Sequence, residues 1–237
     1  MFVVDISALI ARAAEEVIQG RVEEELLKEV QYLDPEDAIH VIDAVERRLA
    51  DGWGRLGEES VEALERFEGA ALPKVAQYVK ERLGLEVPVG AEKGWINKVL
   101  ESLKNIMVDD DDEVWKKGMD EYLYPTPLGI EGVVGLSRLR EALKHVPARE
   151  LLRRVGGSPR LVDFAEAASR APGSYLEVSV ADEWSDGEWI AVSGIYLPLA
   201  EKVDEVAEWL LGRALSPPSN FRFVKVGRKY YLYISWR

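Results

Sequence analysis

A chain of 237 residues, 47% of them hydrophobic, is long enough for one large domain or two ordinary ones, and it does not have the composition of a disordered protein. The absence of cysteine excludes disulfides, thiolate nucleophiles and cysteine-ligated metals, and two histidines are too few for a zinc site built on several imidazoles. Charged residues reach 31%, the formal net charge is −13, and Asn and Gln occur only three times each, a composition that favours a thermophilic source. No run of 18 apolar residues predicts a membrane helix, and we expect a cytoplasmic protein.

The charge is distributed unevenly along the chain. Residues 1–125 carry a net charge of −14, residues 126–173 carry +3, and residues 174–237 carry −2. No acidic residue occurs after Trp209, and six basic residues follow it: Arg213, Arg222, Lys225, Arg228, Lys229 and Arg237. Because a basic surface attracts a polyanion that an acidic surface repels, this asymmetry is the strongest functional indication in the sequence.

Residues 1–125 are predicted to form an acidic, all-helical domain. Apolar residues from Ile6 to Ile18 recur at the spacing of one helix face, and Asp34-Pro35 has the residue types of a helix start. Pro73 is interpreted as the start of another helix. Short breaks between helices, with no strand pattern, favour a helix bundle. Helices are expected at residues 6–18, 35–52, 58–68, 73–83 and 92–107.

The segment MFVVDISALI resembles the opening of PIN-domain nucleases, in which a strand carries a metal-binding aspartate followed by a small hydroxyl residue. The resemblance covers about ten residues and implies these roles for Asp5 and Ser7. The helical pattern from Ile6 to Ile18 explains the same residues with Asp5 as an N-cap, and we adopt this interpretation.

The run VDDDDEVW, residues 108–115, is the most acidic part of the chain. Carboxylates bind Mg²⁺ and Ca²⁺, but adjacent aspartates rarely converge on one ion, and the spacing of a calcium-binding EF-hand loop is absent. Acidic residues favour the N-terminus of a helix, which fits the helical pattern at 114–123. We expect a solvated connection that starts a helix, with a metal site at Asp109–Asp112 as the alternative.

Residues 126–237 are predicted to form an α+β domain, which places the whole chain in the α+β class. The prolines and glycines of YLYPTPLGIEG, residues 122–132, indicate the connection between the domains. Asp186-Gly187 predicts a two-residue hairpin turn with Trp184 opposite Trp189. The expected elements are helices at 133–145, 147–155, 159–171 and 199–214, and hairpins at 174–197 and 221–236.

Three helices followed by a hairpin, over residues 133–197, resemble a winged helix-turn-helix module. Leu152, Gly156 and Val162 have the residue types and spacing that fix the turn of such a module. The resemblance implies that the helix at 159–171 enters the major groove of DNA, with Arg153, Arg154 and Arg160 near the phosphates. The hairpin tip DEWSDGEW is acidic, whereas DNA-binding wings present Arg or Lys, so contact with a protein is the alternative.

The last hairpin alternates aromatic and basic residues. Such a pattern could stack nucleic-acid bases and neutralise phosphates, or its aromatic face could cover the domain core while the cations are solvated. The aromatic residues are Phe221, Phe223, Tyr230, Tyr231, Tyr233 and Trp236, and the basic ones are Arg222, Lys225, Arg228 and Lys229.

No phosphate-binding loop, dinucleotide fingerprint or metalloprotease motif occurs, so we expect no catalytic residue, cofactor or metal. The sequence predicts a non-catalytic nucleic-acid-associated protein. The alternative is an adaptor or scaffold subunit of a larger cytosolic complex, or a homodimer, that uses Trp184 and Trp189 for protein contacts. The residues predicted to bind DNA or RNA are Arg153, Arg154, Arg160, Arg222, Lys225, Arg228 and Lys229.

Overall fold

Two units make up the structure, a computed structural model that describes residues 5–52, 57–108, 121–127, 129–181 and 187–237. Unit 1 comprises residues 1–81 and unit 2 comprises residues 82–237. The sequence places this boundary at residue 125 instead. The difference arises because helix α5 (Trp95–Leu103) packs against α7 (Leu136–Leu143) of the second unit.

Unit 1 is helical, as the sequence predicts. Asp5 caps the first helix, because its carboxylate accepts a hydrogen bond from the backbone N–H of Ala8 at 3.1 Å. The N-cap role predicted for Asp5 is thus confirmed, whereas the residues before it, which would form the strand of the nuclease opening, lie outside the described residues. The helices are α1 (Ile6–Ile18), α2 (Glu24–Tyr32), α3 (Pro35–Gly52) and α4 (Glu58–Leu83), and α1 packs against α3.

Helix α4 is continuous through Pro73, so the prediction of two helices at 58–68 and 73–83 is wrong. A proline inside a helix removes one hydrogen bond and costs about 3 kcal/mol. The helix nevertheless keeps one buried stripe on both sides of the proline, at intervals of four residues, which outweighs this cost. The stripe consists of Ala63, Phe67, Ala71, Val75 and Val79.

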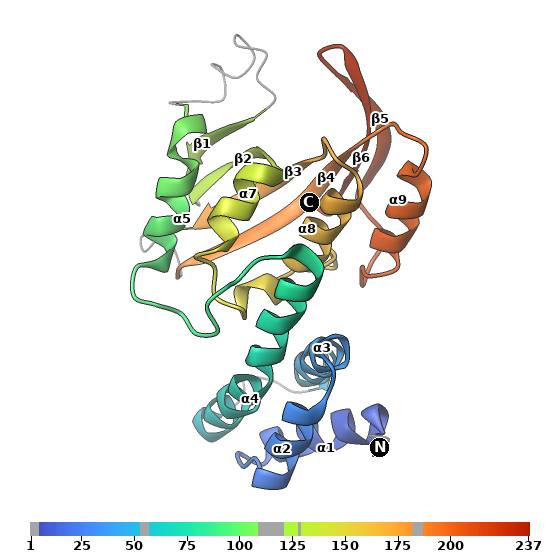
Figure 1. Cartoon of the computed structure of the whole chain (residues 1–237). Helices are drawn as coiled ribbons and strands as arrows, with labels where there is room; N and C mark the ends of the chain where they lie inside the picture. Colours follow the sequence, from blue (N-terminus) through green and yellow to red (C-terminus); the bar gives the residue numbers. More distant parts are fainter. Residues whose placement is uncertain (1–4, 53–56, 109–120, 128, 182–186) are drawn as a thin grey trace. The chain divides into compact units, whose positions relative to one another are not determined.

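Unit 2 is built on a six-stranded antiparallel sheet with the strand order β1-β2-β3-β4-β6-β5. Helices α7 and α8 lie across one face of this sheet (Figure 1). Together with unit 1, the sheet confirms the predicted α+β class. The strands are β1 (Tyr122–Thr126), β2 (Gly129–Gly135), β3 (Tyr175–Ala181), β4 (Trp189–Pro198), β5 (Asn220–Val226) and β6 (Lys229–Ser235). The other helical elements are η1 (Lys104–Ile106), η2 (Glu150–Leu152), α8 (Leu161–Arg170) and α9 (Val203–Leu211).

Strands β1 and β2 occupy the segment that the sequence assigns to an irregular connection, so the expectation that strands begin only at residue 174 is wrong. Gly132 allows the two strands to approach, since a Cβ atom there would lie 2.1 Å from the carbonyl oxygen of Tyr122. Pro125 lies in β1, the first strand of the sheet order and therefore an edge strand, where a missing N–H is tolerated. Glycine and proline, which predict a loop, here fit an edge of the sheet.

The helix-covered face of the sheet forms the core of unit 2. Leu176 pairs with Ile195, and Leu197 pairs with Leu232, all four being buried beneath the helices. Phe164 of α8 packs edge to face against Trp236, with ring centroids 5.7 Å apart.

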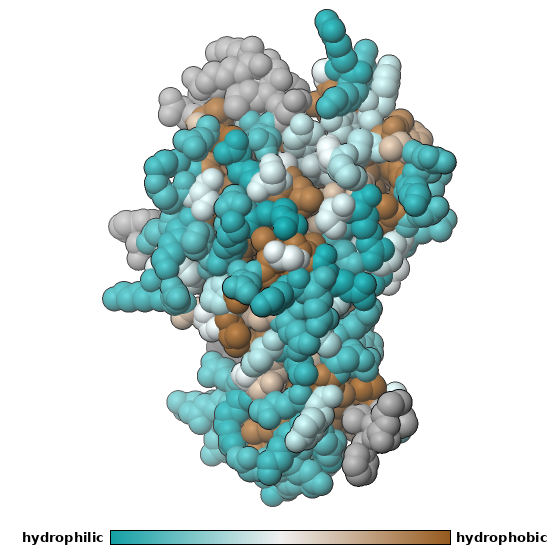
Figure 2. All heavy atoms as spheres, viewed as in Figure 1, coloured by the Kyte–Doolittle hydropathy of each residue, from teal (hydrophilic) through white to brown (hydrophobic). Residues whose placement is uncertain are grey.

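The described helices contain none that is long and apolar enough to cross a membrane. On the side drawn in Figure 2, hydrophilic residues predominate and hydrophobic ones show as separate patches.

The register of the β3–β4 hairpin differs from the prediction. Trp189 pairs with Ala181, which does not fit the predicted pairing across Asp186-Gly187, and Trp184 lies outside the described residues. A register shift between Glu177 and Val178 changes the pairing further along the strands.

Candidate nucleic-acid interface

Helix α8, the element expected to enter the major groove, is buried. Its residues from Leu161 to Ala168 are all inaccessible, because α8 packs against α7, α9, β3 and β4. A recognition helix must present a free side to the groove. The structure therefore gives no support to DNA binding by this helix.

The elements around α8 also differ from the expected module. The helix predicted at 147–155 is reduced to the single turn η2, and the β3–β4 hairpin lies inside the six-stranded sheet instead of extending from it as a wing. Gly156 does adopt the left-handed conformation required at the turn, with φ of +56°. The winged-helix geometry is not confirmed.

Arg160 is engaged within the fold at the start of α8. Its Nε and Nη2 atoms donate hydrogen bonds to the carboxylate of Asp163 at 2.8 and 3.0 Å, and its backbone N–H donates to the same carboxylate at 2.9 Å. Arg213 adds a second cation 3.5 Å from Asp163. The Arg160–Asp163 pair fixes the start of α8, so the guanidinium of Arg160 is not presented to a ligand.

Arg153 and Arg154 also have intramolecular partners. The guanidinium of Arg154 donates to the carbonyl oxygens of Ser158 and Arg213 at 2.6 and 2.9 Å, and thereby holds the loop before α8. Arg153 forms two hydrogen bonds to Glu150 and lies 5.9 Å above the ring of Trp189. The three arginines predicted from the helix-turn-helix pattern thus serve contacts inside unit 2.

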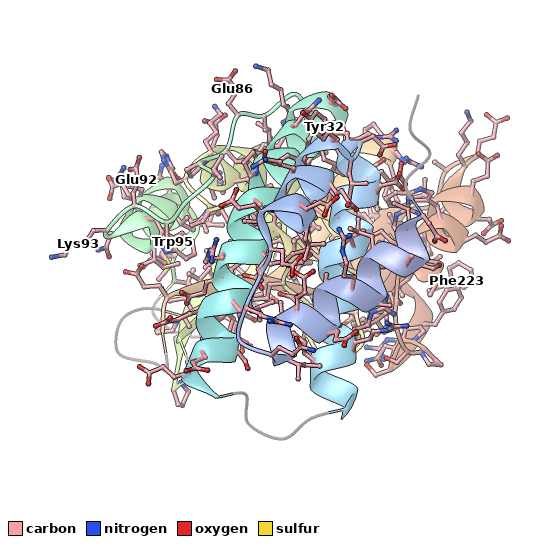
Figure 3. All side chains as sticks on the ribbon, turned by 90° about the horizontal axis from the view of Figure 1, so that it is seen from below. Tyr32, Glu86, Glu92, Lys93, Trp95 and Phe223 are labelled. Carbon is pink, nitrogen blue, oxygen red and sulfur yellow. The ribbon has the colours of Figure 1, made fainter. Side chains whose placement is uncertain are left out.

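The β5–β6 hairpin exposes aromatic side chains. Phe221, Phe223 and Tyr230 are 54%, 70% and 56% exposed. The strand pairing places all three on one face, because Phe223 lies opposite Leu232 and Lys225 lies opposite Tyr230. Figure 3 shows the ring of Phe223 standing clear of the ribbon. Helix α9 packs on β4, so the helix layer ends before it reaches β5.

The aromatic residues of this hairpin are divided between the two roles that the sequence leaves open. Tyr231, Tyr233 and Trp236 are buried, whereas Phe221, Phe223 and Tyr230 are exposed. The alternating pattern indicates an amphipathic hairpin, but it does not tell which residues lie beyond the end of the helix layer. For this reason the three exposed rings are absent from the predicted site residues.

The four basic residues of the hairpin are all exposed. The Arg222 guanidinium lies 5.6 Å from the centroid of the Tyr233 ring, and the Lys225 ammonium lies 5.6 Å from that of Tyr230. Within the part of the chain that the structure describes, no acidic side chain forms an ion pair with Arg222, Lys225, Arg228 or Lys229. Strand pairing places Lys225 on the same face as the three exposed rings, and Arg222 and Lys229 on the opposite face. The four cations and the three exposed rings of this edge hairpin together are called the hairpin patch.

No three His, Asp or Glu side chains converge as metal ligands among the described residues, and Asp109–Asp112 lie outside them. Of the tryptophans predicted to contact a protein, Trp189 is partly covered by Arg153 and Trp184 is not described.

Comparison with known proteins finds no match to a protein-family model, to a curated protein or to a solved structure.

Proposed function

We propose that the chain is a non-catalytic protein that binds single-stranded DNA or RNA through the hairpin patch. The observation that carries this proposal is the combination of three exposed rings with four cations that have no acidic partner among the described residues. The segment after Trp209 contains no acidic residue at all. Phosphates would therefore meet a locally positive surface on a protein that is acidic as a whole.

Stacking would supply the affinity that the few cations do not. Phe221 and Phe223 are two residues apart on β5, so their attachment points lie about 7 Å apart. This distance is about twice the 3.4 Å rise per base of a stacked strand, and it admits one base between the rings. Base–aromatic stacking contributes about 1–3 kcal/mol for each base and does not depend on sequence.

The geometry favours single strands over duplexes. A duplex hides the faces of its bases, so the exposed rings would have nothing to stack on. A duplex reader also needs an element that enters a groove, and α8 is buried. The hairpin patch supports ring stacking combined with phosphate contacts.

Fluorescence anisotropy with a labelled oligonucleotide of about 12 nucleotides tests the proposal, since single-strand sites typically cover about 4–16 nucleotides. If all four cations contact phosphates, the logarithm of the association constant falls with the logarithm of salt concentration with a slope of about −3. Between 50 and 200 mM salt the affinity then drops by roughly fifty-fold. A duplex of the same length should bind more weakly.

Two variants separate stacking from charge. Phe223→Ala should weaken binding by about fivefold to 150-fold without changing the salt slope. Lys225→Gln should reduce the slope by about 0.7. Arg153→Gln is the matched control, because this arginine is paired with Glu150, and it should leave both quantities unchanged. Failure to bind at 50 mM salt, or equal binding by Phe223→Ala and the unchanged protein, would overturn the proposal.

The open edge of β5 favours a second candidate, an adaptor that binds a protein segment. β5 is the last strand in the sheet order, and an extended peptide could add to its free edge. An acidic peptide would suit Arg222 and Lys225. A complex that survives nuclease treatment, and is lost in Phe223→Ala, would support this candidate over nucleic acid.

A further inference from the structure

The sheet face opposite the helices carries a cluster of tyrosines, and only Arg222 of the hairpin patch reaches it, over the ring of Tyr233. Strand pairing places Tyr175 beside Tyr196, and Tyr196 beside Tyr233, on this face. No helix of the described chain packs on it, since Leu176 and Ile195, which face the helices, alternate with these residues. This tyrosine face comprises Tyr122, Tyr124, Tyr175, Tyr196, Tyr231 and Tyr233, together with Glu131 and Glu177.

Glu177 lies among the tyrosines with one of its oxygens unsatisfied. The residue is only 8% exposed. Its Oε1 atom accepts hydrogen bonds from the hydroxyls of Tyr233 at 2.9 Å and Tyr196 at 3.4 Å. Its Oε2 atom is buried and accepts none. Buried carboxylate oxygens are rarely left without a donor, so this atom indicates a place where a donor binds.

Gly194 allows the carboxylate of Glu177 to lie close to the backbone of the neighbouring strand. Gly194 pairs with Glu177 across the strands, and a Cβ atom at Gly194 would lie 2.5 Å from Oε2. Any larger residue would push into the carboxylate. The glycine is therefore required for the observed position of the Glu177 carboxylate.

Arg237 lies loosely over the same place. Its Nε atom is 3.8 Å from Oε2 of Glu177, and its Nη2 atom is 3.5 Å from Oε2 of Glu131, both longer than a charge-assisted hydrogen bond. Nε donates instead to the hydroxyl of Ser193 at 3.1 Å. The Arg237 side chain is 44% exposed. The two carboxylates of Glu131 and Glu177 thus face the single, weakly held guanidinium of Arg237. One positive charge does not neutralise two negative charges, so the site is negative overall.

The tyrosine hydroxyls remain protonated donors at neutral pH. Burial, followed by the charge of Glu177, raises the pKa of Tyr196. Burial also raises the pKa of Tyr122 and Tyr233. Neutral rings beside carboxylates present the negative π faces that attract a flat cation.

We propose that the tyrosine face binds the guanidinium of an arginine side chain from a partner polypeptide, between Glu131 and Glu177, and that Arg237 occupies this place when the partner is absent. A guanidinium is planar, can satisfy both carboxylates at once and stacks on tyrosine rings, whereas an ammonium cannot do all three. Phosphate groups are repelled by the two carboxylates, so this site takes a ligand of opposite charge to that of the hairpin patch, although Arg222 of the patch lies over the ring of Tyr233.

Displacement of Arg237 gives the proposal its test. When a side chain of the protein occupies the binding site, an external ligand can bind only the fraction of molecules in which the site is free. The apparent affinity for the ligand falls in proportion to that fraction. Arg237→Ala should therefore bind the peptide Gly-Arg-Gly-amide about tenfold or more tightly than the unchanged protein. Binding is measured by calorimetry and by the chemical shifts of ring-labelled tyrosine in the full chain. Arg66→Ala, which removes an exposed arginine of unit 1, is the matched control and should have no effect.

Ligand and protein variants decide the remaining alternatives. A peptide with citrulline in place of arginine should not bind, and adding Glu177→Gln to Arg237→Ala should abolish the gain. If Glu177→Gln does not fold, Glu131→Gln serves the same purpose, since Glu131 is closer to solvent. Ethylguanidinium should bind at least about tenfold more weakly than the peptide, because a polypeptide adds contacts outside the guanidinium. Equal binding of the citrulline peptide, no gain in Arg237→Ala, or equal affinity for ethylguanidinium would overturn the proposal.

Discussion

Removal of Asp163 tests whether the arginines around α8 serve the fold or a ligand. The carboxylate is buried and accepts three hydrogen bonds from Arg160, two from its guanidinium and one from its backbone N–H. Removing one partner of a buried ion pair costs about 3–5 kcal/mol. The side chain of Arg160 is 13% exposed and can turn partly to solvent, which favours the lower end of this range. We predict that Asp163→Ala lowers the free energy of unfolding of unit 2 by about 3–4 kcal/mol.

Urea unfolding followed by tryptophan fluorescence measures this change, because six of the seven tryptophans belong to unit 2 and only Trp53 belongs to unit 1. Glu141→Ala is the control, since Glu141 pairs with Lys144 at the same sequence spacing but on the exposed side of α7, and its loss should cost less than about 1 kcal/mol. In Asp163→Ala/Arg160→Ala, the total should fall short of the sum by about 1–3 kcal/mol. A loss in Asp163→Ala no larger than in Glu141→Ala would refute the structural role and return Arg160 to the candidate phosphate contacts.

Three further predictions concern the tyrosine face, helix α4 and the turn before α8. The raised pKa of Tyr196 means that the unfolded chain loses this proton first. The contribution of Tyr196 to the free energy of unfolding should therefore be constant below about pH 10 and fall above it, by at most about 1.4 kcal/mol per pH unit, and Tyr196→Phe should flatten the decline in alkaline unfolding curves. Pro73→Ala should stabilise unit 1 by about 1–3 kcal/mol, because the substitution restores the missing hydrogen bond of helix α4. Thermal unfolding followed by circular dichroism measures this change. A lower stability of the variant would show that the helix needs a bend at the proline. Gly156→Ala should lower the free energy of unfolding by about 1–2 kcal/mol, because its backbone is left-handed. Gly157→Ala should lower it more, because the added Cβ atom would lie 2.1 Å from the hydroxyl oxygen of Ser216. Equal thermal unfolding temperatures of the two variants would contradict this order.

Local patterns predict most elements of the fold but not their assembly. The amphipathic stripe of α1 and the final hairpin follow from residue spacing alone, and both are present. The strands β1 and β2 were not predictable in this way, because Pro125 and Gly132 break the strand pattern and are accommodated only next to the rest of the sheet. Similarly, Pro73 ends a helix by its local preference, whereas the buried stripe of α4 continues through it. Tertiary packing overrides local preference in each case.

The sequence identifies the cations of the candidate site more readily than its surroundings. Clustering of basic residues after Trp209 directs attention to Arg222 and Lys225, but nothing in the pattern indicates that Arg160 is held by Asp163. Glu177 gives a faint signal, as an acid in the otherwise apolar strand YLEVSVA. Its importance depends on residues more than fifty positions away, such as Tyr233, which no local pattern brings to it.

The position of β5 at the edge of the sheet has a consequence for how this protein could change over evolutionary time. Side chains of β5 that face solvent can be exchanged without disturbing the core, because Leu232 and Ile234 on β6 retain the packing. The same edge invites unwanted pairing with other chains, and cations such as Arg222 and Lys225 discourage it. Exchange of Phe221 and Phe223 is therefore compatible with the fold, while solubility constrains the charges of Arg222 and Lys225.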